Sequence, residues 1–292
     1  MRFAKPSGCY TADLLTNRLS ESRRISTMPQ KTTRIGLIGY GQIGAEVHKM
    51  IDQDPNNGMK VVFVHDQLEQ RLAELPGDLV LRDLGDFATK EPDLVVEMAH
   101  ADVTRQWGER LLEKTNYMLI SVTALADREI EKMLEETTRK HGTRAFLPHG
   151  GVVGMDALLE NRDVWDEVHS IMKKPPKNVD CAAAGVDPDS VTEEKVLYDG
   201  PTRGVCPLFP RNTNTLAAIA YAGIGFDRTH STLIVNPEWD TATVEIHAKG
   251  GGITLDVSRV EGITGVTGAS TPASIFNTVQ MIGSTGPGIH IR

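Results

Sequence analysis

The chain has 292 residues, of which 40% are hydrophobic, and a formal net charge of −8 at pH 7. A chain of this length can bury one large core or two modest ones. The acidic balance argues against nucleic acid and against an anionic membrane surface as partners, and no apolar run approaches the roughly 20 residues that span a bilayer. We therefore expect a cytoplasmic globular protein.

The three cysteines, Cys9, Cys181 and Cys206, are odd in number and widely spaced. This spacing fits neither a disulfide framework nor a zinc-binding pattern, so no metal site is expected. Residues 1–32 are polar, rich in Ser, Thr and Arg, and lack a steady periodicity. They contain no apolar signal core, which counts against export. We expect them to form a disordered or poorly ordered N-terminal extension.

An apolar strand at residues 35–38 leads into a glycine-spaced turn that opens a helix. The spacing G-x-G-x-x-G is typical of dinucleotide sites: the first glycine allows a tight turn, the second lets the backbone approach a pyrophosphate, and the third lets the helix pack closely against the strand. The N-terminus of the helix then offers free N–H groups to the phosphates. The residues predicted to contact NAD or NADP here are Gly39, Gly41, Gln42, Ile43 and Gly44.

A second apolar run, at residues 59–65, ends in Asp66. Folds of this kind place an acidic residue there against the adenosine ribose, where it accepts hydrogen bonds from both hydroxyls and repels a 2′-phosphate. Asp66 therefore favours NAD, although Arg71 nearby weakens the discrimination against NADP. The alternative interpretation is that Asp66 is a solvated turn residue.

The first half continues as alternating strands and helices. Strands are expected at 79–81, 92–98, 117–122 and 144–148, and helices at 103–114 and 127–141. Such continuous apolar strands indicate a parallel sheet that is covered on both faces. We predict an α/β protein whose residues 33–149 form a Rossmann-type doubly wound parallel sheet. Ala99 and Ser121, at the ends of two of its strands, are also assigned to the cofactor.

The alternation of strands and helices ends after His149. Strands are expected at 167–173, 230–235, 241–249 and 253–260, and they abut one another through turns. These strands predict a mostly antiparallel sheet in a second, α+β domain over residues 150–271. A dinucleotide domain followed by such a domain is the layout of many two-domain dehydrogenases, in which the substrate lies in the crevice between the domains. A helix at 212–222 interrupts the strands. A last helix, within residues 272–292, is expected to return to the first domain.

Three segments of the second half, 149–158, 208–214 and 222–229, carry a more specific likeness. Together they resemble the L-aspartate dehydrogenase family, and the likeness runs from about Arg34 to the C-terminus. The resemblance implies NAD(P)-dependent oxidative deamination of L-aspartate to iminosuccinate, which hydrolyses to oxaloacetate, or the reverse reaction. It also implies a homodimer or a higher homo-oligomer.

Such a reaction needs cations or amide donors for two substrate carboxylates, and a group that moves a proton at the amine. Arg211 can hold a carboxylate with two N–H bonds, and Asn212 lies beside it in sequence. Asn214 is assigned to the cofactor. The alternative is that Asn212 and Asn214 cap the following helix. Asp156, in the matched glycine-rich segment, is equally a helix-start residue or a ligand contact.

One departure from the family concerns its catalytic histidine. The family carries an Asn-x-His pair in the strand that follows an Asp-Pro turn, and the counterpart of that turn in this chain is Asn236-Pro237. An ungapped alignment places Ala242 and Val244 at the two positions. His247 stands three residues further on, and because side chains alternate along a strand, it should point away from the face of Val244. The expected proton carrier is therefore missing.

Two other histidines, His149 and His100, replace small family residues at the carboxyl ends of parallel strands, where ligands bind in open α/β sheets. We hypothesise that one of them, His149 in preference, transfers the proton; the alternative for both is a structural role. A family lysine is also absent from residues 269–274. These departures leave open a related dehydrogenase or reductase acting on another small carboxylate, such as a 2-oxo acid, an imine or a hydroxy acid. A non-catalytic nucleotide-binding regulator also remains open.

Overall fold

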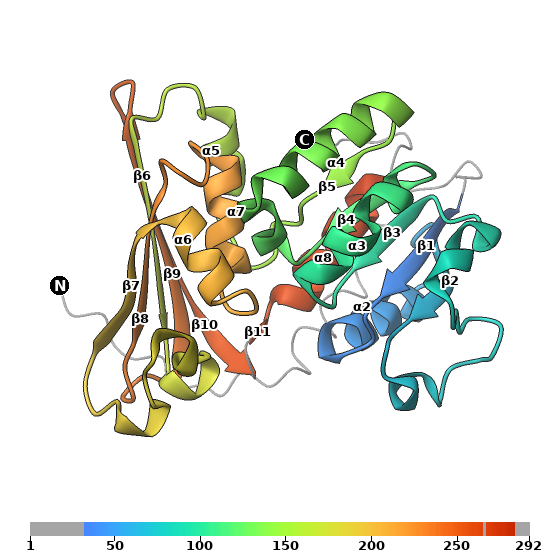
Figure 1. The fold of residues 1–292 in the computed structure, drawn as a ribbon, viewed down its shortest axis with the longest axis horizontal. Coiled ribbons are helices and arrows are strands. Elements are labelled where there is room, and N and C mark those ends of the chain that lie inside the picture. The colour runs from blue at the N-terminus through green and yellow to red at the C-terminus, as the bar shows by residue number, and fades with distance from the viewer. Residues whose placement is uncertain (1–31, 265–266, 284–292) are drawn as a thin grey trace. The chain divides into compact units, whose positions relative to one another are not determined.

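The computed structural model describes residues 32–264 and 267–283, and its first sheet is parallel throughout (Figure 1). Within the described residues this sheet has the strand order β2-β1-β3-β4-β5. The strands are β1 (Thr33–Ile38), β2 (Met59–His65), β3 (Leu94–Glu97), β4 (Asn116–Leu119) and β5 (Ala145–Phe146). The predicted Rossmann-type sheet is confirmed. The expected N-terminal extension, apart from Thr32, lies outside the described residues, as does Cys9.

Helices bury both faces of this sheet. They are α2 (Gln42–Gln53), α3 (Ala101–Leu112), α4 (Arg128–His141) and α8 (Thr271–Gly283). Neighbouring strand residues alternate between two cores: Val95 packs with residues of α3 and α4, whereas Val96 packs with residues of α2 and α8. Because both faces are covered, the strands are apolar throughout, as the sequence suggested. The last helix thus packs on the first sheet, while the domain boundaries themselves stay a prediction.

The second sheet lies beside the first and has the order β11-β10-β9-β6-β8-β7. Its strands are β6 (Glu167–Lys174), β7 (Lys195–Pro201), β8 (His230–Val235), β9 (Thr241–Gly250), β10 (Ile253–Thr264) and β11 (Thr267–Gly268). All neighbouring pairs are antiparallel except β6 and β8, which confirms a mostly antiparallel sheet. The helices α5 (Met155–Glu160), α6 (Thr202–Leu208) and α7 (Asn214–Ala222) lie on one of its faces (Figure 1).

Short 3₁₀ helices connect several of these elements. They span Glu69–Leu72, Leu84–Lys90, Val122–Ala126, Pro176–Asn178, Cys181–Ala184 and Pro188–Ser190. None of the helices in the described part of the chain combines the length and the apolar character that crossing a membrane requires.

Some elements differ from the sequence-based expectation. The predicted strand at 79–81 contributes only a single bridge between Val80 and Val64. Helix α7 begins at Asn214, its N-cap is Thr213, and no side chain caps it, so neither Asn212 nor Asn214 serves as a cap. Strand β7 and helix α6 were not expected. Strand β7 lies at the edge of its sheet with much of its length exposed, so it lacks the apolar alternation that predicts a strand.

Candidate active site

The glycine turn, residues 39–44, is built for a close approach by a ligand. Gly39 has a φ of +93°, and a Cβ atom there would lie 2.7 Å from the main-chain carbonyl of Met98. A Cβ on Gly44 would lie 2.1 Å from the carbonyl oxygen of Gly39. At Gly41, by contrast, the nearest atom to a Cβ would be Nη1 of Arg71 at 3.8 Å. Gly39 and Gly44 are therefore required by packing, whereas Gly41 leaves open space beside the backbone.

Helix α2 begins directly at this turn, with Gly41 as its N-cap, no side-chain cap and no acidic residue in its first turn. The first N–H groups of a helix have no partner within the helix, and they carry partial positive charge. The open space at Gly41 and these N–H groups form a cradle that fits the pyrophosphate of NAD(P).

Asp66 is tied into the same turn. Its carboxylate accepts hydrogen bonds from the backbone N–H groups of Tyr40 (2.7 Å) and Leu68 (2.8 Å), and it lies 3.2 Å from Nη1 of Arg71. Burial raises the pKa of Asp66, but these donors outweigh burial and the pKa is lowered overall. Asp66 is therefore an ionised residue that fixes the glycine turn, rather than a solvated turn residue. Its contact with the ribose stays a prediction.

Arg71 lies between the Asp66 carboxylate and the open side of Gly41, and its side chain is 46% exposed. A 2′-phosphate on the adenosine ribose would meet this guanidinium. We expect Arg71→Ala to weaken NADPH binding by about 10-fold or more, since a hydrogen bond to a charged group contributes about 1.5–3 kcal/mol. NADH binding should change far less. Fluorescence titration with both cofactors measures the two Kd values.

Arg82→Ala is the matched control for Arg71→Ala, because Arg82 is a surface arginine that pairs with Glu69 instead. It should leave both Kd values unchanged. An equal loss of NADH and NADPH binding in Arg71→Ala would show that Arg71 does not recognise the 2′-phosphate.

Glu97 ends strand β3 with its side chain fully buried. It accepts hydrogen bonds from the N–H of Ala99 (2.7 Å), the N–H of Ser121 (3.0 Å) and the hydroxyl of Ser121 (2.8 Å). Burial raises the pKa of Glu97, and these donors oppose that shift. Ala99 and Ser121, both assigned to the cofactor from sequence, are thus held by one carboxylate. The sequence analysis missed Glu97, although a lone acid at the end of an apolar strand was a visible signal.

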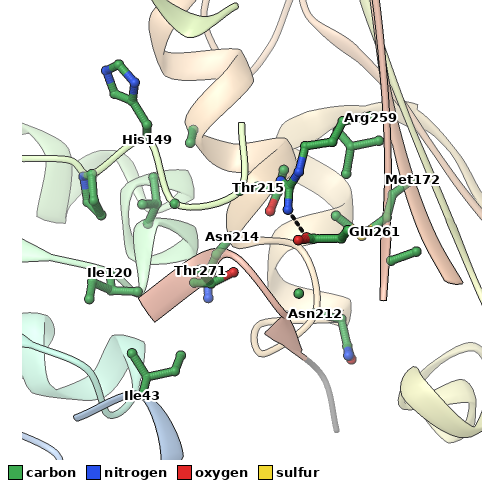
Figure 2. Close-up of a pocket in the computed structure, with 18 of the residues that line it drawn as sticks. Ile43, Ile120, His149, Met172, Asn212, Asn214, Thr215, Arg259, Glu261 and Thr271 are labelled. Atoms are coloured by element: carbon green, nitrogen blue, oxygen red, sulfur yellow. Dashed lines mark ion pairs between the residues drawn. The ribbon is translucent and has the colours of Figure 1, made fainter. Parts of the chain in front are cut away.

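A cleft open to solvent lies between the glycine turn and the second sheet (Figure 2). Clefts between domains are common binding sites for small molecules. The first domain contributes Ile43, Ile120 and Val122. The polar lining comes from the second domain and from the segment that joins the two: His149, Lys174, Arg211, Asn212, Asn214, Thr215, Arg259 and Glu261, with Thr271 at the start of α8.

The three polar residues Arg211, Asn212 and Asn214 make different contacts in the structure. Arg211 is exposed at the cleft and has no ion-pair partner among the described residues. Asn214 accepts hydrogen bonds at Oδ1 from the N–H and the hydroxyl of Thr123, both at 3.1 Å, and so joins α7 to the first domain. Asn212 accepts from the N–H of Asp180 (3.2 Å) and donates to the carbonyl of Asn178 (3.1 Å). Arg211 is therefore the group of this segment that is available to a substrate anion.

Lys174, the last residue of β6, lines the cleft and is only 6% exposed. Burial lowers its pKa to about 8. Met172 is the register partner of Val244 across β6 and β9, and residues two apart in a strand share a face. The side chain of Lys174 therefore points into the cleft, two residues along β6 from Met172, the residue that lies opposite Val244. Lys173 points to the other face, where it pairs with Glu245 at 2.7 Å.

Arg259 and Glu261, both on β10, form an ion pair at the cleft (Figure 2). The guanidinium of Arg259 also donates to the hydroxyl of Ser270 (2.9 Å), and Glu261 accepts from the N–H of Ser270 (3.1 Å). Burial lowers the pKa of Arg259, but a guanidinium stays charged in proteins. The cleft thus holds a second arginine, which the sequence analysis did not identify.

The three histidines considered from sequence lie apart from one another. His149 lines the cleft, but it is exposed, and its ring points away from Asn214 and Glu261 (Figure 2). His100 is the N-cap of α3, where it accepts from the N–H of Asp102, and it is not among the residues that line the cleft. His247 lies on the face of the sheet opposite to the cleft, with Nδ1 2.7 Å from Asp256. The catalytic assignments of His149 and His100 stay predictions, and the position of His247 agrees with the expectation that it does not replace the family histidine. Asp156, in the first turn of α5, does not line the cleft either.

Two family models match the chain, and they divide it as the two sheets do. Residues 39–148 match the NAD-binding domain of homoserine dehydrogenase, and residues 156–282 match the C-terminal domain of aspartate dehydrogenase. An aspartate dehydrogenase domain-containing protein from Xenopus tropicalis is 32% identical, over 94% of this chain and 100% of the relative. The chain belongs to the L-aspartate dehydrogenase family.

Other members of this family are also similar to this chain over most of its length. An L-aspartate dehydrogenase from Methanosarcina barkeri is 30% identical over 74% of this chain and 83% of its own length. An L-aspartate dehydrogenase from Cupriavidus necator is 30% identical over 88% of this chain and 99% of its own length. The crystal structure of aspartate dehydrogenase from Thermotoga maritima has a TM-score of 0.68, at 22% identity, covering 88% of this chain and 99% of that one. This likeness supports the fold. As a family member, the protein is an NAD(P)-dependent oxidoreductase that acts on an amino donor.

Proposed function

We propose that the protein oxidatively deaminates L-aspartate to iminosuccinate, which hydrolyses to oxaloacetate, or catalyses the reverse reaction. The charge of the cleft carries this proposal. Among the described residues that line it, three side chains are cationic, Lys174, Arg211 and Arg259, and one, Glu261, is acidic. A surplus of positive charge in a chain whose net charge is −8 favours a substrate with two carboxylates.

The two arginines suit the two carboxylates differently. Arg211 is exposed, and its guanidinium can grip a carboxylate through two parallel N–H bonds. The N-terminus of α7, which follows it, adds partial positive charge. Arg259 is already paired with Glu261, so it would share its donors between Glu261 and the second carboxylate. Aspartate and oxaloacetate both present two carboxylates to such a pair.

Lys174 supplies the proton carrier in this proposal. When bound, NAD(P)⁺ supplies the hydride acceptor. Before the hydride leaves Cα, the substrate ammonium must lose a proton, and neutral Nζ of Lys174 accepts it. In the reverse direction, the Lys174 ammonium donates a proton to the developing amine. With a pKa of about 8, Lys174 populates both forms near neutral pH, as acid–base catalysis requires. In this proposal Lys174 takes the catalytic role of the histidine that the family carries at the position of Val244.

Absorbance of NADH tests the reaction directly. We expect oxidation of NADH with oxaloacetate plus ammonium, and none with oxaloacetate alone. A panel of 2-oxo acids without ammonium provides the comparison. Turnover in that panel would support the related dehydrogenase that acts on another small carboxylate. Tight NADH binding without turnover in any mixture would contradict the proposal.

Val244→His restores the residue that the family carries in this strand. Val244 lines the cleft, opposite Met172 in the register, so an imidazole there would enter the same space as Lys174. We expect the variant to keep activity with aspartate and to show a second acid–base ionisation near pH 6.5, the ordinary pKa of histidine. The pH profile of kcat measures it. A profile identical to that of the natural protein would show that position 244 no longer reaches the reacting amine.

Three sequence-based expectations remain part of the proposal: the cytoplasmic location, the homodimer or higher homo-oligomer, and the cofactor contacts of residues 39–44, Asp66, Ala99, Ser121 and Asn214. Analytical ultracentrifugation of the purified chain tests the oligomer.

A further inference from the structure

Three histidines stand in one row across the outer face of the second sheet. His169 on β6 is the register partner of His230 on β8 and of His247 on β9. Register partners point to the same side of a sheet, and His169 alternates with Ser170, whose side chain is buried toward the helices. The row therefore lies on the face opposite to Lys174 and the cleft. These residues are more than 60 positions apart from His169 in sequence, so no spacing motif announces them.

Asp199, on the edge strand β7, completes a cluster with two of these histidines. One carboxylate oxygen, Oδ1, lies 2.7 Å from Nε2 of His230 and accepts a hydrogen bond from the hydroxyl of Thr232 at 2.8 Å. Nε2 of His169 lies 2.8 Å from the same hydroxyl. The rings of His169 and His230 are 4.8 Å apart and nearly perpendicular. One ligand atom each from His169, Asp199 and His230 falls within 4.8 Å of the others.

We propose that His169, Asp199 and His230 form a binding site for a divalent transition-metal ion, with Zn²⁺ as the best chemical match. Two imidazole nitrogens, a carboxylate oxygen and a water make a common tetrahedral zinc environment, with bonds of about 2.0–2.2 Å. The sequence offered no zinc pattern, because the ligands come from three different strands. The site needs no residue of the catalytic cleft, so it would be independent of the aspartate dehydrogenase reaction.

Two ligand atoms bound at that length in a tetrahedral site lie about 3.4 Å apart. Nε2 of His230 and Oδ1 of Asp199, now 2.7 Å apart, must therefore separate slightly and approach Nε2 of His169. The two edge ligands are free to do so, because the side chains of His230 and Asp199 are 47% and 61% exposed. Their movement would disturb no core packing. His169, which is half-buried in the middle of the sheet, serves as the fixed point.

The hydroxyl of Thr232 lies within hydrogen-bond distance of two of the three ligand side chains, His169 and Asp199. Thr232 donates to the Asp199 carboxylate, as an outer-shell partner of a metal ligand does. The bound ion would join β6, β7 and β8, and we infer that it stabilises the second domain.

Metal binding to the full chain tests this inference. After dialysis against EDTA, the protein is titrated with Zn²⁺ by calorimetry and with Co²⁺ by visible absorption, which reports tetrahedral coordination. We expect one equivalent to bind and Zn²⁺ to raise the Tm, because an ion that binds only the folded state stabilises it. His169→Ala and Asp199→Asn should each weaken binding by more than about tenfold, since even outer-shell changes cost about 10- to 100-fold.

His141→Ala is the matched control, because His141 is an exposed histidine at the end of α4. It should bind Zn²⁺ like the natural chain. Asp199→Asn keeps a side chain of the same shape, so its Tm without metal shows whether the variant folds. Absence of stoichiometric binding, or binding that survives both His169→Ala and Asp199→Asn, would overturn the inference. Turnover of aspartate by the metal-free variants should stay at the natural level, which separates this test from that of the proposed function.

Discussion

Lys174→Met is expected to lower kcat by about 10²- to 10⁴-fold, the usual contribution of a positioned acid–base group, without changing the Kd of NADH. Lys174 lies in the cleft beside Val244, where the family has its histidine, and the glycine turn proposed to bind the cofactor lies on the other domain. Methionine keeps most of the length and volume of the side chain, so the buried site should not collapse. Steady-state rates with oxaloacetate and ammonium, together with NADH titration, measure both quantities.

Lys173→Met provides a matched control for this experiment. Lys173 is the preceding residue on the same strand, but it points to the other face and pairs with Glu245. It should retain the natural kcat. Equal losses of activity in the two variants would indicate a general effect on β6 and would contradict a catalytic role for Lys174.

Arg211→Met is expected to raise the KM for oxaloacetate and for L-aspartate by about 10- to 100-fold, because a charged hydrogen bond contributes about 1.5–3 kcal/mol. Its guanidinium lies at the cleft and has no ion-pair partner among the described residues, so its removal strands no buried acid. The kcat should change less than KM, since a carboxylate grip acts on substrate and transition state alike. Saturation curves for both substrates give the two parameters.

Arg228→Met is the control for Arg211→Met, because Arg228 is an exposed arginine that does not line the cleft. It should leave KM unchanged. Arg259 is a less suitable test residue, since removing it would leave Glu261 without its ion-pair partner at the cleft. A natural KM in Arg211→Met would show that the substrate carboxylates are bound elsewhere.

The cofactor half of the protein could be predicted from sequence because its determinants are local. Gly39 and Gly44 are required by contacts with the backbone of adjacent elements, and the turn that they form lies between two apolar strands. Asp66 follows the second of these strands directly. Continuous apolar strands also predicted a sheet buried on both faces, which is what the two cores show. The glycine turn and Asp66 lie within 27 positions of each other, and each strand was recognised from its own apolar run.

The substrate half could not be predicted to the same depth, because its determinants are set by strand register. Lys173 and Lys174 are adjacent and chemically identical, and only the pairing of β6 with β9, about 70 residues later, decides which one enters the cleft. Arg259 is one of several charged residues on β10, and its place at the cleft likewise depends on pairing with β9. A one-residue shift in register would exchange the faces of every such side chain.

Local chemistry also gave several residues more than one interpretation. Asn212 and Asn214 suited a helix cap from sequence, yet the structure uses Asn212 to hold the segment at 178–180 and Asn214 to join α7 to Thr123. His100 at a strand end suited proton transfer, and in the structure it is also the N-cap of α3. Glu97 was overlooked, although a buried carboxylate that closes an apolar strand requires several donors and usually organises its surroundings.

The pH dependence of kcat/KM for L-aspartate, measured for the natural chain and for Lys174→Met, tests the central claim most directly. Lys174 must be neutral to accept a proton, and its pKa is about 8, so kcat/KM should rise with pH through about 8 and then level off. In the direction of amination the same group must be protonated, so kcat/KM should fall above that pH. The residual activity of Lys174→Met should lack this ionisation in both directions, whereas Lys173→Met should keep it. An inflection near pH 8 that persists in Lys174→Met would contradict the assignment of Lys174 as the proton carrier.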